Sequence, residues 1–211
     1  GGAGNDTIVL STNFSTSDSF DGGDGTDTAT LDVTTTIAPT FTNVERVTVG
    51  FTTGGAFNAG NSSSLERITI EETTDGTDAS AVVINVPTGV NTILTDGSGT
   101  DLADLTTVTL DTVAGATSTV TTRYAGASAL TITDAASVTV NAASTAVNAS
   151  VGSLVLDDND TTSLTVTGAS GAYTLGTGNI TGTDSVTSLN VTSSTTDGTV
   201  TLGTIVDADS L

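Results

Sequence analysis

The chain has 211 residues, with 24 acidic side chains against 3 basic ones, a formal net charge of −21, and no His, Cys, Met or Trp. These absences exclude disulfides, zinc sites built on Cys or His, and cysteine nucleophiles, and so anionic a chain is a poor partner for nucleic acid. No apolar run is long enough to cross a membrane, so the sequence predicts no membrane span.

The pattern of residues predicts an ordered all-β chain in spite of its charge. High net charge with modest hydrophobicity is typical of disorder, but Pro numbers only 2 and Val, Ile and Leu stand in alternation with Thr and Ser. The charge then calls for a bound counter-ion. The chain opens inside a glycine motif, so we expect it to be a piece of a longer protein.

Residues 1–38 are rich in Gly and Asp and carry two copies of the pattern G-G-x-G-x-D-x-U-x, at 1–9 and 22–30. Glycine permits tight turns in which backbone carbonyls point inward, and Asp adds a charged oxygen, which together suit calcium. Asp6 and Asp27 are expected to flank one ion, whereas the simpler interpretation is a pair of ordinary turns. The candidate metal-binding residues are Gly2, Gly4, Asp6, Gly23, Asp24, Gly25 and Asp27.

Residues 39–211 repeat a short six-residue phrase, with apolar residues at its first, fourth and sixth positions. The copies are Val44-Val47-Val49, Leu65-Ile68-Ile70, Leu105-Val108-Leu110, Val151-Leu154-Leu156 and Val186-Leu189-Val191, with weaker ones at Ala127-Leu130-Ile132 and Ala135-Val138-Val140. Several intervals lie near multiples of about 20 residues, the length of one coil of a parallel β-solenoid. We therefore predict a β-roll continuing into an irregular solenoid rod, with tandem β-sandwiches as the alternative.

Further acidic turns follow in the second segment. Residues 96–101 keep most of the glycine motif, so Asp96, Gly97, Gly99 and Asp101 are candidate calcium ligands. The turns at 75–78 and 157–160 are weaker candidates. Arg46 and Arg67 each follow a Glu at the same place in neighbouring phrases, which predicts that the two Glu-Arg pairs stack on the outside of adjacent coils.

The chain resembles RTX-type bacterial surface proteins, and most closely their self-assembling surface-layer members. The resemblance is carried by the two glycine motifs, by residues 20–27 and by the stretch Phe41-Thr42-Asn43-Val44-Glu45-Arg46-Val47. The resemblance implies a calcium-bound β-roll, secretion to the bacterial cell surface and assembly with further copies of the same protein. It also implies contact with cell-surface polysaccharide through other parts of the full protein.

Three function classes follow from these observations. The first is a structural component of a surface layer that calcium makes rigid. The second is the stalk of an RTX adhesin or filament. The third is a polysaccharide-active module on a β-solenoid, which we rank last because a single Arg-Glu ladder explains the few cations better than a catalytic site does. We expect no enzymatic activity. Rows of Thr are explained by strand propensity better than by binding of ice or carbohydrate.

Overall fold

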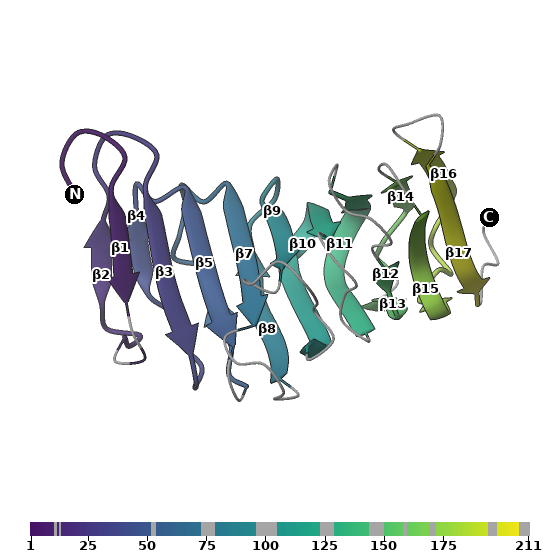
Figure 1. The fold of residues 1–211 in the computed structure, drawn as a ribbon, viewed down its shortest axis with the longest axis horizontal. Coiled ribbons are helices and arrows are strands. Elements are labelled where there is room, and N and C mark those ends of the chain that lie inside the picture. Colours follow the sequence, from purple (N-terminus) through teal and green to yellow (C-terminus); the bar gives the residue numbers. More distant parts are fainter. Residues whose placement is uncertain are drawn as a thin grey trace.

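The computed structural model describes residues 1–10, 12, 14–51, 54–72, 79–95, 105–122, 129–143, 150–157, 160–168, 172–193 and 198–206. Strands lie side by side along the long axis of the molecule, in chain order from the N-terminal to the C-terminal end (Figure 1). The strands are β1 (Thr7–Leu10), β2 (Ser19–Asp21), β3 (Thr28–Val33), β4 (Thr40–Thr42), β5 (Arg46–Phe51), β6 (Phe57–Asn58), β7 (Arg67–Glu72), β8 (Ala79–Val86), β9 (Asn91–Thr95), β10 (Leu105–Thr122), β11 (Ala129–Ala142), β12 (Ser150–Val151), β13 (Ser153–Leu156), β14 (Ser163–Gly168), β15 (Ala172–Thr181), β16 (Ser188–Ser193) and β17 (Thr199–Ile205).

One long face of the molecule shows how the chain winds. Strands β1, β3, β5, β7 and β9 pair in that order, followed by the second halves of β10 and β11 and then by β14 and β16. Every strand pair in the described ranges is parallel. Parallel pairing of consecutive coils confirms the β-solenoid and excludes the tandem β-sandwich alternative, because sandwiches of that kind are antiparallel.

Registered partners on this face give the length of each coil. The first pairs are Thr7 with Thr28, Thr28 with Arg46, and Arg46 with Arg67, so successive coils take 21, 18 and 21 residues. Later coils are less regular: Asn91 pairs with Thr119, 28 residues on, and Thr119 with Thr139, 20 residues on. The coil length therefore varies around the predicted unit, and the turns absorb the difference.

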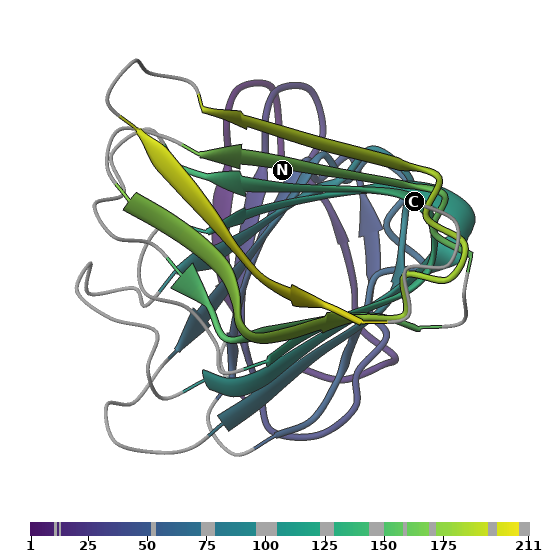
Figure 2. The same cartoon turned by 90° about the vertical axis from the view of Figure 1, so that its right-hand side faces the viewer.

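A second long face runs opposite the first, and a short third sheet is present at the N-terminal end. The second face contains β6, β8, the first halves of β10 and β11, and β12, β13, β15 and β17. A short third sheet of β2 and β4 lies at the N-terminal end. Viewed along the long axis, the strands surround a common interior (Figure 2).

The interior is filled by the apolar residues of the repeated phrase. Val47 pairs with Ile68 and Val49 with Ile70, and all four side chains are buried. Thr48 and Thr69 lie between them on the outward side of the strands, as period-two alternation requires. One cluster of buried side chains runs continuously from Ala29 to Val186, so the stacked coils share a single core.

Phenylalanine thickens the core at the N-terminal end. The ring centroids of Phe14 and Phe41 are 5.8 Å apart and nearly parallel, and Phe41 lies 6.4 Å from Phe57. Phe41 and Phe57 are buried, whereas Phe14 is partly buried. This row of rings links neighbouring coils at the N-terminal end.

The sheet continues across the change of composition at residues 38 and 39, because β3 pairs with β5 over its whole length. A search of the described residues for a helix long and apolar enough to cross a membrane found none.

Candidate metal site in the glycine and aspartate turns

The two glycine motifs form arched turns that stack on each other. They lead into β1 and β3 and rise side by side at one edge of the molecule (Figure 1). Ala3 and Asp24 form a parallel bridge, with Gly4 N donating to Asp24 O at 2.7 Å and Asp24 N donating to Gly2 O at 3.0 Å. The predicted pairing of the motifs is therefore present, and the backbones of the two arches touch.

Glycine is required in the second arch for two reasons. Gly23 and Gly25 have φ angles of 98° and 141°, which side chains rarely adopt. A Cβ at Gly23 would overlap the carbonyl oxygen of Gly2, and a Cβ at Gly25 would overlap that of Gly4. The arches can stack at this distance because neither position carries a side chain.

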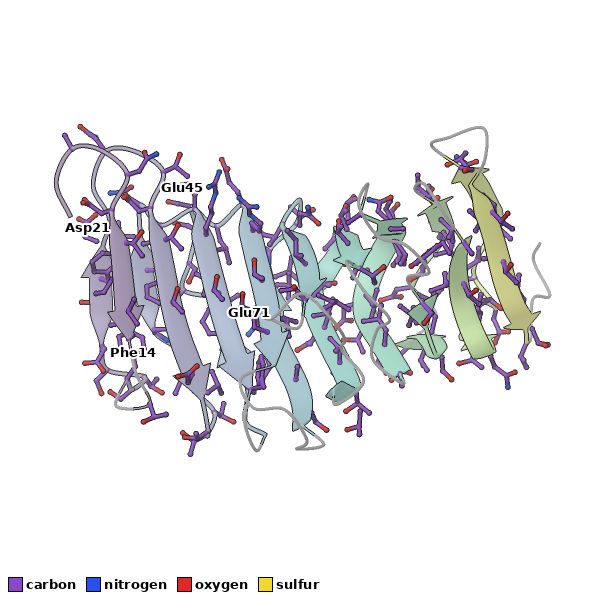
Figure 3. All side chains as sticks on the ribbon, viewed as in Figure 1. Phe14, Asp21, Glu45 and Glu71 are labelled. Carbon is purple, nitrogen blue, oxygen red and sulfur yellow. The ribbon has the colours of Figure 1, made fainter. Side chains whose placement is uncertain are left out.

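An acidic column stands at the edge from which the strands begin. It consists of the four acidic residues that come directly before the registered residues Thr7, Thr28, Arg46 and Arg67: Asp6, Asp27, Glu45 and Glu66. Asp6 N donates to Asp27 Oδ1 at 2.6 Å, and Asp27 N donates to Glu45 Oε2 at 2.8 Å. The carboxylates of Asp27 and Glu45 therefore each hold a backbone amide of the preceding coil. Figure 3 shows Glu45 at this edge, with Asp21 beside the first coils.

Asp27 is the most enclosed member of this column. It has no exposed surface, and its Oδ2 atom is buried without a hydrogen-bond partner among the described residues. A buried, unpaired carboxylate oxygen is costly unless a cation or a proton satisfies it. The atom lies against Gly22, where a Cβ would overlap both Asp27 Oδ2 and the carbonyl oxygen of Asn43.

The same arrangement recurs one coil earlier with a different outcome. A Cβ at Gly1 would overlap Asp6 Oδ2 and the carbonyl oxygen of Gly22. Asp6 Oδ2, however, accepts a hydrogen bond from Gly2 N at 2.8 Å. In the second arch the corresponding amide, Gly23 N, donates instead to Asp21 Oδ1 at 3.1 Å, so Asp27 Oδ2 is left over.

Asp21 and Asn43 complete the surroundings of Asp27. Asp21 Oδ1 also accepts a hydrogen bond from Asn43 Nδ2 at 2.9 Å, which ties the second arch to the next turn. Asp24 is exposed, and the bonds that hold it in the arch come from its backbone. The second arch and the next turn thus bring the buried carboxylate of Asp27 and the carbonyl of Asn43 together against Gly22.

This donor set fits a hard cation with oxygen ligands. Calcium takes six to eight oxygens from carboxylates, carbonyls and water. Within the described ranges, no group of three or more Asp, Glu, His or Cys side chains converges, so an ion here would draw most of its ligands from backbone carbonyls. Asp27 Oδ2 is a side-chain oxygen without a hydrogen-bond partner among the described residues, and the carbonyl oxygen of Asn43 lies with it against Gly22.

The structure brings all the predicted residues of the two motifs into the stacked arches: Gly2, Gly4, Asp6, Gly23, Asp24, Gly25 and Asp27. Asp96, Gly97, Gly99 and Asp101 lie outside the described residues, as does the turn at 75–78. Arg46 and Arg67 are registered partners on adjacent coils, as the phrase predicted. Sequence reasoning assigned Glu45 to the outer ladder and missed its bond to Asp27, although the 18-residue interval from Asp27 to Glu45 was visible.

Comparison with protein-family models, with curated proteins and with solved structures found no match to the chain.

Proposed function

We propose that this chain is a structural segment of an extracellular bacterial surface layer, made rigid by calcium bound in its stacked glycine and aspartate turns. The observation that carries the proposal is Asp27 Oδ2, a fully buried carboxylate oxygen with no partner among the described residues, beside the carbonyl-rich arches. A calcium ion there would neutralise the carboxylate and join the second coil to its neighbours.

The net charge supports the same function. At −21 the chain repels itself, and a cation that binds the folded coils and not the unfolded chain stabilises the fold. Where calcium is scarce the first coils would remain loose, and where calcium is abundant they would close. Such a dependence suits a secreted protein of the cell surface that assembles outside the cell.

The proposed partner is a second copy of the chain. A solenoid with one continuous core is a stiff rod, which suits both a lattice and the stalk of an adhesin. The two functions differ in what calcium does to the purified protein: a lattice component forms sheets, and a stalk remains a monomeric rod.

The first prediction concerns the calcium dependence of folding. Titration of the chelated protein with calcium, followed by far-UV circular dichroism, is expected to increase the strand signal. Asp27→Asn, which removes the buried charge, is expected to raise the calcium concentration at the midpoint about tenfold or more. Asp32→Asn changes the charge equally in the same coil but lies beyond the arches in β3, and is expected to leave the midpoint unchanged.

Two outcomes would overturn the calcium role: a strand signal that chelation does not alter, or equal midpoints for the two variants. Electron microscopy of the calcium-loaded wild type then tests the surface-layer role. Ordered sheets that disperse on chelation are expected. If only isolated rods form at every protein concentration, the surface-layer function is rejected and the adhesin stalk is favoured.

A further inference from the structure

The chemistry that ties one coil to the next changes at Glu45. Between the first three coils, carboxylate oxygens accept backbone amides: Asp27 Oδ1 from Asp6, and Glu45 Oε2 from Asp27. Backbone bonds run along the whole column: Thr28 N donates to Asp6 O at 2.9 Å, Arg46 N to Asp27 O at 3.1 Å and Asn91 N to Glu66 O at 3.0 Å. Among the described residues of the column, Glu45 is the last whose carboxylate accepts the amide of the preceding coil.

The length of the turn explains why a Glu stands at this position. The coil that ends at Glu45 is three residues shorter than the one before it, 18 against 21, and its turn lacks the glycine arch. Asn43 makes the tight turn with a left-handed φ of 52°. Because the arch is missing, the side chain must reach back to the Asp27 amide, and Glu has one more methylene than Asp for this purpose.

The bond joins the carboxylate of Glu45 to the backbone of the residue that carries the buried carboxylate. Asp27 is held at two points: Glu45 binds its amide, and its own Oδ1 binds Asp6 N. With the backbone and one carboxylate oxygen fixed, the remaining oxygen, Oδ2, has a defined position against Gly22. Partners of this kind, which orient a metal ligand without touching the metal, strongly affect metal affinity.

We propose that Glu45 is a positioning residue for calcium binding: from outside the glycine motifs, it holds Asp27 so that Oδ2 faces the cation. The inference rests on the proposed calcium site. It also assigns Glu45 as the boundary of calcium control. Beyond it, Asp111 Oδ1 accepts from the Thr133 hydroxyl and not from a backbone amide, and several other ties between coils are bonds donated by hydroxyl groups to backbone carbonyls.

Hydroxyl groups supply such bonds in the later coils. Thr112 Oγ1 donates to Thr133 O at 2.9 Å, Thr161 Oγ1 to Ala135 O at 2.7 Å, and Thr183 Oγ1 to Val206 O at 2.8 Å. All three threonines are buried. Neutral ties of this kind join consecutive coils without a counter-ion, so these coils are expected to keep their structure when calcium is removed.

The second prediction compares three variants of the acidic column by calcium titration calorimetry. Glu45→Ala removes the acceptor and is expected to weaken calcium binding about tenfold or more. Glu45→Gln keeps an acceptor oxygen at nearly the same place, so the affinity should recover to within about threefold of the wild type. Glu66→Ala removes the same charge one coil further on and is expected to have no effect, because Glu66 joins its neighbours through its backbone.

Hydrogen exchange in the presence of chelator separates this inference from the calcium site itself. The amide of Asp27 should exchange faster in Glu45→Ala than in the wild type, while amides of β11 and β14 remain protected with or without calcium. If the wild type does not bind calcium but the Asp27 amide exchanges faster in Glu45→Ala, the calcium site is rejected, whereas the hydrogen bond from Asp27 N to Glu45 is supported. The positioning role is overturned if Glu45→Ala binds calcium as the wild type does, or if Glu45→Gln is as weak as Glu45→Ala.

Discussion

Buried polar groups show how single residues are adapted to this narrow core. Asp27 holds a neighbouring coil with one carboxylate oxygen, and its other oxygen is buried without a hydrogen-bond partner among the described residues. Tyr173 lies in β15 with 1% of its surface exposed, and its hydroxyl lies 3.5 Å from Thr122 Oγ1, which joins two opposite faces of the solenoid. Desolvation by burial raises the pKa of Tyr173 to about 12, against an ordinary value of 10.0.

The third prediction follows from this pKa. The folded protein binds the phenol proton of Tyr173 more tightly than the unfolded chain does. The contribution of this group to the free energy of unfolding is therefore fully present below pH 10 and is lost as the pH rises to about 12. The two-unit difference corresponds to a loss of about 3 kcal/mol. Tyr173→Phe removes the ionisation, so its unfolding free energy should change less over the same range. Denaturant unfolding at pH 9 and above measures this, and equal pH dependence in both proteins would contradict it.

Individual strands divide their residues between core and solvent with a period of two. In the inward row on the first face, Val140 pairs with Val166, and Val166 pairs with Val191. Val140 is fully buried, whereas Val191, in the last strand of this face, is 41% exposed. The same residue type in the same row therefore contributes differently according to whether a further coil covers it.

The fourth prediction uses this pair of valines. Val140→Ala should lower the unfolding free energy by about 2 kcal/mol, because it removes buried methyl groups and leaves a cavity. Val191→Ala is a matched control that should cost less than about 0.5 kcal/mol. Denaturant unfolding of both variants in the same calcium concentration provides the comparison. Equal losses would mean that the two positions do not differ in burial.

At the scale of the whole molecule, the charge and the fold oppose each other. A single core runs the length of the solenoid, but the chain carries 24 acidic groups against 3 basic ones. On the described strands from β10 onward, the charged side chains are Asp111 and Asp134, so most acidic groups of this half lie outside the described strands. The repulsion therefore acts mainly between groups that lie outside these strands.

The fifth prediction is that screening stabilises the metal-free protein. With chelator present, an increase of NaCl from about 0.01 M to about 0.5 M shortens the range of charge repulsion severalfold and should raise Tm. KCl should have the same effect, since screening does not depend on the identity of the monovalent cation. A Tm that stays constant or falls with salt would show that repulsion between these groups does not limit stability.

Much of the candidate site could be predicted because its chemistry is local. The motifs at 1–9 and 22–30 define each arch by residue type and spacing, and their stacking follows from similar coil lengths. The part played by Glu45 could not be predicted, because it depends on a turn three residues shorter than its predecessor, and turn length alters what a side chain can reach. The residues 96–101 remain a prediction.

The sequence by itself determined the all-β class, the inward positions of the repeated phrase and the location of the glycine arches, because period-two alternation and glycine turns are properties of short segments. Only the tertiary structure decided which faces the strands share, that Asp27 is fully buried with one oxygen unpaired among the described residues, and that Glu45 holds its amide. Burial and cross-coil hydrogen bonds arise between residues about 20 positions apart, and the register that brings them together depends on the lengths of all the turns between them.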